Sequence, residues 1–85
     1  MIKNKIEFIN DFLNDDTNTK ANNLYMIVND DIINLVNYST IIASKKINDK
    51  TINLNIKKYN QTTSKNQNYI KRIATQKGYT IKEYQ

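Results

Sequence analysis

The N-terminal segment has the apolar spacing of an amphipathic helix. One side of that helix would carry Ile2, Ile6, Ile9, Phe12 and Leu13. We therefore expect a helix over residues 2–14. Residues 15–23 lack apolar periodicity and are rich in Asp, Asn and Thr. Because such side chains hydrogen-bond their own backbone, this second segment is predicted to be a loop.

The middle of the chain carries the signals of β-strands joined by short turns. The expected strands are residues 24–28, 32–36, 40–43 and 51–56. Asn29-Asp30 has the composition of a two-residue hairpin turn, and Asn48-Asp49-Lys50 would turn the chain before the last strand. In that strand Ile52, Leu54 and Ile56 alternate with polar residues, which predicts a strand with one face in water.

A second amphipathic helix is predicted over residues 65–77. Ser64 followed by Gln67 matches a capping box, and Gly78 stands where a glycine commonly ends a helix. At about 100° per residue, the helix would have one apolar side and an opposite, mainly basic side. The apolar side comprises Tyr69, Ile70, Ile73 and Ala74. The basic side comprises Lys65, Asn68, Lys71, Arg72 and Thr75.

The predicted elements follow one another in the order α-β-β-β-β-α-β. The last of them, residues 79–84, is a short edge strand that Lys82 and Glu83 would protect from unwanted pairing. Consecutive hairpins favour antiparallel pairing, so the sequence predicts an α+β fold. We expect a small antiparallel sheet of four to five strands with an N-terminal and a C-terminal helix on one face. With 85 residues and no linker or internal repeat, residues 1–85 are expected to form a single domain.

Composition excludes large classes of chemistry. The chain has no Cys and no His, which rules out disulfides, cysteine-type zinc sites, thiol nucleophiles and imidazole catalysis. We therefore expect no enzyme activity, no cofactor and no metal. Asp15-Asp16 and Asp30-Asp31 would each offer two carboxylates, but both pairs stand in turns, where Asp is favoured for backbone reasons. No apolar run approaches the roughly 20 residues of a membrane span, so a soluble, intracellular protein is expected.

The net charge of +5 is divided unevenly along the chain. Residues 1–44 have three lysines and six carboxylates, a net charge of −3, whereas residues 45–85 have nine lysines, one arginine and two carboxylates, a net charge of +8. Such an asymmetry indicates an anionic partner, most commonly nucleic acid. An equally weighted alternative is a lysine-rich solvated surface, which an AT-rich coding sequence would produce without selection for charge.

The segment that leads into the second helix is a candidate anion site. Thr62, Thr63 and Ser64 combine hydroxyl groups with free backbone amides at the positive end of a helix, which suits a phosphate or a carboxylate. Ordinary capping by Ser64 explains the same residues and is commoner. Most tyrosines are expected to supply core area, but Tyr59 and Tyr79 are candidates for stacking on bases or docking into a partner. The whole candidate surface comprises Lys57, Lys58, Tyr59, Thr62, Thr63, Ser64, Lys65, Asn68, Lys71 and Arg72.

Two short patterns resemble a known family. Tyr38-Ser39-Thr40-Ile41-Ile42-Ala43 is followed by Tyr59-Asn60-Gln61-Thr62-Thr63-Ser64-Lys65-Asn66-Gln67-Asn68. They are similar to small phage and mobile-element domains of unknown function that read roughly Tyr-Ser/Gly-Thr-x-Ile-Ala, a hairpin, and Tyr-Ser-x-Thr-Thr-Ser-Lys-x-x-Asn. The likeness covers about residues 38–73; Asn60 replaces the usual Ser, and Asn66 stands where His is common. The resemblance implies a phage accessory protein in the cytoplasm of a bacterial host.

Two functions follow as hypotheses. The leading one is a non-enzymatic, phage-encoded protein that binds a host effector protein or nucleoprotein complex through the basic helix and inhibits it, as an anti-CRISPR does. The alternative is a small basic nucleic-acid-binding or regulatory protein, which contacts phosphates of DNA or RNA without reading their sequence. A small enzyme ranks well below both. Neither leading hypothesis involves a membrane, and both leave a monomer or a homodimer open.

Overall fold

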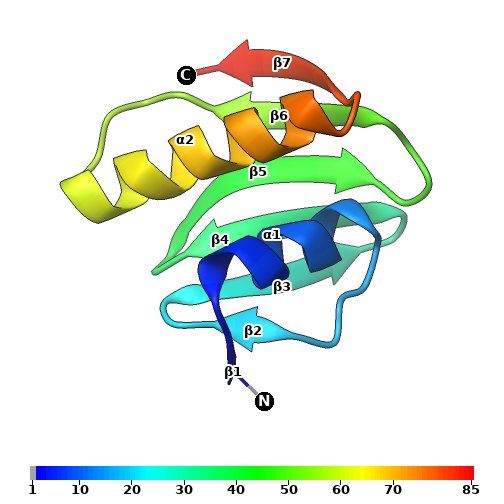
Figure 1. Ribbon diagram of the computed structural model, residues 1–85, viewed down its shortest axis with the longest axis horizontal. Coiled ribbons are helices and arrows are strands. Elements are labelled where there is room, and N and C mark those ends of the chain that lie inside the picture. The colour runs from blue at the N-terminus through cyan, green and yellow to red at the C-terminus, as the bar shows by residue number, and fades with distance from the viewer. Residues whose placement is uncertain (1) are drawn as a thin grey trace.

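The structure, a computed structural model that describes residues 2–85, is a seven-stranded sheet with both helices on one of its faces (Figure 1). The strands lie side by side in the order of the chain. The α+β class and the two helices are as predicted. The elements are β1 (Ile2–Lys3), α1 (Lys5–Leu13), β2 (Lys20–Ala21), β3 (Leu24–Asn29), β4 (Ile32–Asn37), β5 (Thr40–Lys46), β6 (Thr51–Asn55), α2 (Gln61–Gln76) and β7 (Thr80–Tyr84).

The prediction of an antiparallel sheet of four to five strands is wrong in two respects. The sheet has seven strands, since it includes β1 and β2, which were not predicted. Each of these strands is only two residues long, and so short a strand shows no apolar alternation in a sequence. The sheet is also mixed. β1 pairs with β2 in parallel and β6 pairs with β7 in parallel, while the strands between them are antiparallel. Each edge is thus a β-α-β unit.

The hand of these two units places both helices on the same side of the sheet. Strand direction alternates from β2 to β6, so the strands of both units run the same way. Both crossovers also step across the sheet in the same direction and are right-handed, as such connections nearly always are (Figure 1). α1 and α2 therefore cover one face and contact each other. Among residues 2–85, no helix lies on the other face.

Helix α1 is shorter than predicted and is turned differently. It begins at Lys5, because Asn4 caps it: the Asn4 side chain accepts a hydrogen bond from the Glu7 N–H at 2.9 Å. Ile6 is 44% exposed, whereas the buried side comprises Phe8, Ile9, Phe12 and Leu13. Ile2 lies outside the helix, in β1, and is also exposed. Burying both phenylalanine rings removes more apolar area from water than burying Ile6 would, so the stripe that the sequence predicts is rotated towards Phe8.

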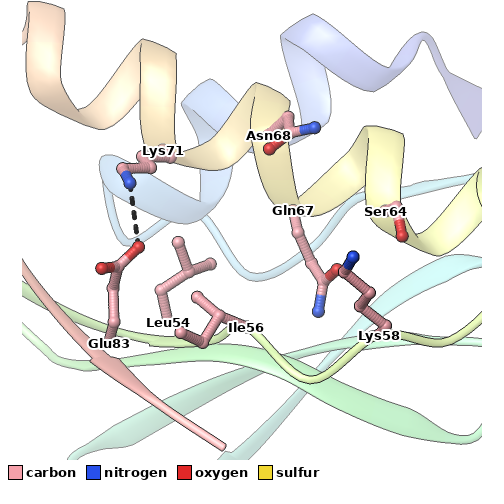
Figure 2. A pocket seen from close by; sticks show the side chains of 8 residues that line it. All are labelled: Leu54, Ile56, Lys58, Ser64, Gln67, Asn68, Lys71 and Glu83. Atoms are coloured by element: carbon pink, nitrogen blue, oxygen red, sulfur yellow. Dashed lines mark hydrogen bonds and ion pairs between the residues drawn. The ribbon is translucent and has the colours of Figure 1, made fainter.

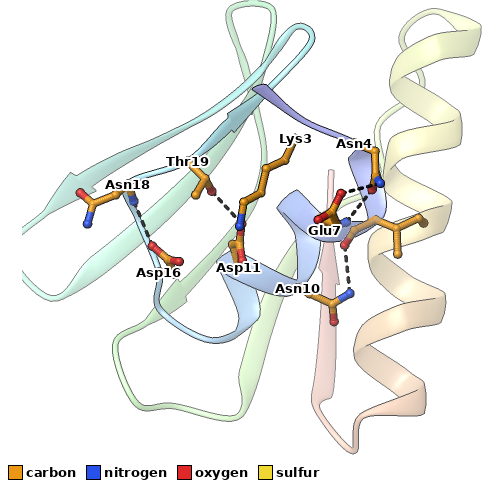
Figure 3. Close-up of polar contacts among 9 residues, drawn as sticks. Lys3, Asn4, Glu7, Asn10, Asp11, Asp16, Asn18 and Thr19 are labelled. Carbon is orange, nitrogen blue, oxygen red and sulfur yellow. Dashed lines mark hydrogen bonds and ion pairs between the residues drawn. The ribbon is translucent and has the colours of Figure 1, made fainter. Parts of the chain in front are cut away.

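A carboxylate on the polar side of α1 contacts both strands at the first edge of the sheet, β1 and β2. The Asp11 carboxylate accepts from the Lys3 ammonium at 2.9 Å and from the Thr19 hydroxyl at 3.0 Å (Figure 3). Lys3 belongs to β1, and Thr19 directly precedes β2. The ammonium–carboxylate hydrogen bond, together with nearby carboxylate charge, raises the pKa of Lys3. One helix carboxylate thus connects the two short strands that α1 joins.

The core lies between the sheet and the two helices. Its sheet side includes a bulge in β5: Leu35 pairs with Ala43 and Val36 pairs with Ile41, so Ile42 has no partner across the pair. Ile42 and Ala43 are consecutive, yet both are buried. The buried apolar cluster comprises Phe8, Ile9, Phe12, Leu13, Ala21, Leu24, Ile33, Leu35, Ile42, Ala43, Ile52, Leu54, Ile70, Ile73 and Ala74.

A buried ion pair, which no local sequence pattern indicates, joins the two layers. The Lys45 side chain is fully buried in β5, where its ammonium donates to the Asp15 carboxylate and to the Lys46 carbonyl at 2.9 Å. Asp15 follows α1 in a left-handed conformation, with φ of 62°, and also accepts from the Asn48 N–H at 2.8 Å. Lys45 is therefore not part of the basic surface that its half of the chain predicts.

The Asp15 carboxyl has a lowered pKa. Its burial alone would raise the pKa, but the hydrogen bonds from Lys45 and Asn48, together with the charges of Lys45 and Lys50, outweigh that effect. A carboxyl whose pKa is lower in the folded than in the unfolded chain stabilises the fold above the unfolded value of about 3.9. That contribution is lost as the pH falls through the folded pKa.

Replacement of Ile9 by Ala tests the orientation of α1. Ile9 is fully buried, so Ile9→Ala should lower the free energy of unfolding by about 2–4 kcal/mol. The matched control is Ile6→Ala in the same helix, where the exposed side chain should cost less than about 1 kcal/mol. Urea denaturation followed by circular dichroism measures both. Equal losses for the two variants would contradict the observed orientation.

Replacement of Asp15 by Asn tests the buried ion pair. At neutral pH the variant should lose about 3 kcal/mol, the lower end of the range for a broken buried pair, because the Asp15 side chain keeps some contact with water. The difference between wild type and variant should shrink as the pH falls from about 5 to about 2, since protonation removes the same charge from the wild type. Urea denaturation at several pH values measures this, and a difference independent of pH would rule the pair out as a stabilising contact.

Candidate functional site

Helix α2 begins at Gln61, four residues before the predicted start, because Asn60 caps it. The Asn60 side chain accepts from the Thr63 N–H at 2.8 Å, and the Asn60 carbonyl accepts from the Ser64 N–H at 3.0 Å. The capping box predicted for Ser64 and Gln67 is therefore wrong. Ser64 lies inside the helix, and its hydroxyl takes no part in capping. Several residues in this segment are of types that can cap a helix, and the cap in the structure is Asn60, four residues before Ser64.

The end of α2 is as predicted. Gly78 adopts a left-handed conformation with φ of 83°, which a residue with a Cβ rarely adopts. The Gly78 N–H donates to the Thr75 carbonyl at 3.1 Å, and the Tyr79 N–H donates to the Ala74 carbonyl at 2.9 Å. These two bonds form a Schellman motif, which turns the chain directly into β7.

Gln67 docks α2 on the sheet. Its side-chain amide is buried and donates to the Asn55 carbonyl at 2.7 Å and to the Lys57 carbonyl at 3.1 Å. Residues 55–57 form the end of β6 and the start of the connection to α2. The position of this connection relative to the helix is thereby fixed, and Lys58 faces α2 across a narrow cleft (Figure 2).

The cleft between α2 and strands β6 and β7 has a volume of about 280 Å³. Its lining comprises Leu54, Ile56, Lys58, Ser64, Gln67, Asn68, Lys71 and Glu83. The Lys71 ammonium and the Glu83 carboxylate form an exposed ion pair at 2.9 Å (Figure 2). A volume slightly below the roughly 300–1,000 Å³ of small-molecule pockets suits one protruding group of a larger partner. Leu54 and Ile56 offer that group apolar contact, and Lys58 and Ser64 offer hydrogen-bond donors.

A second hollow of about 250 Å³ lies on the neighbouring side of α2 and is lined by Lys65, Asn68, Tyr69 and Arg72. The carbon at the centre of the Arg72 guanidinium is 5.3 Å from the centroid of the Tyr69 ring, a cation–π contact. Lys65, Asn68 and Arg72 are exposed, which confirms the predicted basic side of α2. Ile70, Ile73 and Ala74 are buried as predicted, but Tyr69, predicted on the apolar side, is half-buried and lines the basic hollow. Asn68 lines both hollows and joins them.

The two hollows together are strongly basic. Their linings contain four cationic side chains, which are Lys58, Lys65, Lys71 and Arg72. Glu83 is the one carboxylate among the residues that line them, and it is already paired with Lys71. We call Lys58, Lys65, Asn68, Lys71 and Arg72 the α2 surface. Its excess of positive charge favours an anionic partner.

Other residues of the predicted site lie elsewhere. Thr63 is buried, and its hydroxyl donates to the Asn37 side chain at 2.7 Å, so it is used inside the fold. Thr62 is half-buried. The Asn55 side chain donates to the Tyr59 hydroxyl at 3.1 Å, and the Lys57 ammonium is 5.8 Å from the centroid of the Tyr59 ring. Lys57 and Tyr59 therefore form a group of their own, apart from the α2 surface.

Tyr79 also has a structural role. Its hydroxyl donates to the Leu13 carbonyl at 2.6 Å, and the Lys50 ammonium lies 4.5 Å from the centroid of its ring. Tyr79 thus ties the start of β7 to the end of α1, and its ring is covered by Lys50. These contacts disfavour the predicted role of Tyr79 in stacking on a base.

Asn66 is a buried polar residue of α2. Neither its side-chain nitrogen nor its oxygen has a hydrogen-bond partner within residues 2–85. An unsatisfied buried amide costs about 1–3 kcal/mol. Glu83 was missed as part of the site, because β7 returns to α2 only through a parallel pairing that no local signal indicates.

Neither the metal-ligating groups, the helix lengths nor comparisons with known proteins indicate a ligand for the α2 surface. Within residues 2–85, no three Asp or Glu side chains gather where they could hold a metal ion. Neither α1 nor α2 is both long and apolar enough to cross a lipid bilayer. Comparisons with protein-family models, with curated proteins and with solved structures gave no match.

Replacement of Asn60 by Ala tests which residue caps α2. Asn60→Ala should lower the free energy of unfolding by about 1 kcal/mol, the usual cost of a lost cap. Ser64→Ala is the control and should change stability by less than about 0.5 kcal/mol, since Ser64 lies inside the helix. Thermal denaturation measures both variants. A larger loss for Ser64→Ala than for Asn60→Ala would restore the predicted capping box.

Proposed function

We propose that the protein is a non-enzymatic, phage-encoded binding protein that attaches to a host nucleoprotein defence complex and blocks it, as an anti-CRISPR inhibitor does. The α2 surface carries this proposal, because it places four cationic side chains along one helix and the adjoining chain with a single carboxylate among them. The resemblance of residues 38–73 to phage and mobile-element domains supports the phage context. The site of action would be the cytoplasm of the bacterial host.

The shape of the α2 surface favours a partner that contains protein. Each hollow pairs cationic groups with apolar or aromatic surface: Leu54 and Ile56 in the cleft, and the Tyr69 ring in the second hollow. Tyrosine and arginine are enriched among residues that dominate protein interfaces, and hollows of this size accept single side chains. A nucleoprotein offers both side chains for the hollows and phosphates for the lysines.

Direct nucleic-acid binding is the second candidate, and one observation favours it. Lys65, Asn68 and Arg72 are spaced i, i+3 and i+7 and line one hollow, so they follow one side of α2 for about 10 Å. A row of exposed donors of this kind can lie along a phosphate backbone. Asn68 and Arg72 are the two members able to contact base edges, which would give little sequence preference.

Charge reversal on the α2 surface tests the proposed function. The Lys71→Glu/Arg72→Glu double variant should fail to protect a targeted phage in a strain with active CRISPR immunity. It should also fail to block target cleavage by the purified effector–guide RNA complexes that the wild type inhibits. Lys5→Glu/Lys77→Glu is the matched control: it changes the net charge equally, but neither residue lines either hollow, so it should remain inhibitory. Circular dichroism verifies that both variants fold.

Two outcomes would contradict the proposal. A wild-type protein that inhibits none of the effector classes tested would contradict the function itself, and a folded double variant with full inhibition would contradict the role of the α2 surface. Tight binding of free duplex by the wild type points to the second candidate instead. In that case the double variant should bind more weakly, and the slope of log K against log salt should fall by about 2, one unit for each lost phosphate contact.

A further inference from the structure

The face of the sheet without helices is a second surface, and strand register identifies its residues. Partners across neighbouring strands point to the same side of a sheet. Ile27 pairs with Asn34, and the pairing continues through Ser44 and Asn53 to Lys82. These residues form one row across five strands, from β3 to β7. We call this side of the sheet the open face.

A second row runs parallel to the first. Tyr25 pairs with Val36, which pairs with Ile41. The Asn55 side chain donates to the Ile41 carbonyl at 3.1 Å, and Asn55 pairs with Tyr84. A tyrosine therefore stands at each end of this row. The distance between the outer strands of the row is about 19 Å, four strand spacings.

Exposure agrees with this assignment. Tyr25, Ile41 and Tyr84 are 39%, 43% and 41% exposed, whereas Leu24 and Leu54, which alternate with members of the row, are each 1% exposed. The helices bury one set of alternating side chains and leave most of the other set in contact with solvent; in the second row Val36 and Asn55 are the exceptions, at 2% and 6% exposed. Tyr25, Ile41 and Tyr84 are therefore available to a partner.

The charges of the open face all have one sign. Lys46 is the register partner of Ile32, and Lys82 lies in the first row. Lys20 is the register partner of Ile2, which is exposed, so Lys20 faces the same side. Lys3, the neighbour of Ile2, points the other way and pairs with Asp11 on α1. Among the strand residues of the described chain, no Asp or Glu faces this side: the one acidic strand residue, Glu83, lines the cleft beside α2.

An aromatic and basic group lies at one end of the open face. Tyr84 is the register partner of Asn55, whose side chain donates to the Tyr59 hydroxyl. Burial raises the pKa of Tyr84, and the proximity of the Tyr59 phenol raises it further, which agrees with two neighbouring rings. Lys57 lies near the Tyr59 ring, and Lys82 is two residues before Tyr84. Two half-exposed rings are thus flanked by two lysines.

We propose that the open face binds a single strand of nucleic acid. Tyr25, Tyr59 and Tyr84 would stack on bases, and base–aromatic stacking on a sheet is an established mode of single-strand recognition. Lys46, Lys57 and Lys82 would contact phosphates. The amides and hydroxyl of the first row, on Asn34, Ser44 and Asn53, would hydrogen-bond exposed base edges. A duplex does not fit this chemistry, because its base faces are stacked on one another. The inference concerns another surface and another ligand than the proposed function.

The charges argue against a second copy of the chain as the occupant. Two open faces packed about a twofold axis would bring lysines against lysines, with no carboxylate on either strand surface to neutralise them. An anionic partner gains from the same arrangement. The open face also has exposed aromatic rings and side-chain amides, which can contact bases. This favours a nucleic acid over an acidic protein surface, which has no bases.

Fluorescence anisotropy with labelled oligonucleotides tests the proposal on the full chain. The probes are oligouridylate and oligothymidylate of about 12 nucleotides, within the range that one small domain covers, and a duplex of equal length. The wild type should bind the single strands more tightly than the duplex. Tyr25→Ala and Tyr84→Ala should each weaken single-strand binding by about 5- to 100-fold, while Tyr84→Phe should bind like the wild type because it keeps the ring. Circular dichroism checks that each variant folds.

Two charge variants locate the binding surface. Lys46→Glu/Lys82→Glu should abolish single-strand binding, whereas Lys71→Glu/Arg72→Glu, which has the same net charge, should bind at least half as tightly as the wild type. The reverse pattern would overturn the inference and support the second candidate function on the α2 surface. A failure here is therefore distinguishable from a failure of the proposed function, which is read from inhibition.

Three further results would overturn the inference. The first is a wild type that binds neither single strand at low salt. The second is equal affinity for the duplex, since stacking would then contribute nothing. The third is equal affinity for polyglutamate, which has charge but no bases and would indicate an acidic protein as the partner.

Discussion

The placing of both helices on one face of the sheet determines the rest of this structure. The two edge units have the same strand direction, step across the sheet in the same sense and cross over with the same hand, so no other placement is open to them (Figure 1). One face becomes the core and the other stays in water. The molecule consequently has two chemically distinct surfaces: the outer side of α2, with its two hollows, and the bare side of the strands.

Polar contacts fix the two layers relative to each other. Lys45 reaches Asp15 from the buried side of β5, and Gln67 reaches the end of β6 from α2. Each contact occupies core volume that an apolar side chain would fill, and each polar group must be satisfied where it is buried. The first contact holds Asp15, just after α1, against β5, and the second holds the connection after β6 against α2. The position of Lys58 beside the cleft follows from the second contact.

The sequence was informative where one local signal decides the structure. The strands from β3 to β6 were predicted from apolar, β-branched runs bounded by turn residues, with alternation in β6 alone. The end of α2 was predicted from Gly78, which has a backbone conformation that favours glycine. The basic side of α2 followed from helical periodicity. Contacts between distant segments were not predictable: β1 and β2 are too short for a pattern, and Glu83 reaches the cleft through parallel pairing. Asn60 and Ser64 are both good caps by residue type, so local sequence does not distinguish them, and in the structure Asn60 is the cap.

The most direct test of two separate surfaces is chemical-shift mapping by nuclear magnetic resonance on the ¹⁵N-labelled chain, titrated with oligouridylate. A 10.0 kDa protein suits this measurement. Amide resonances of β3–β7, including those of Tyr25, Ile41 and Tyr84, should shift with increasing ligand, while those of residues 65–72 on α2 should stay in place. Shifts confined to residues 65–72, or none at all, would contradict this expectation.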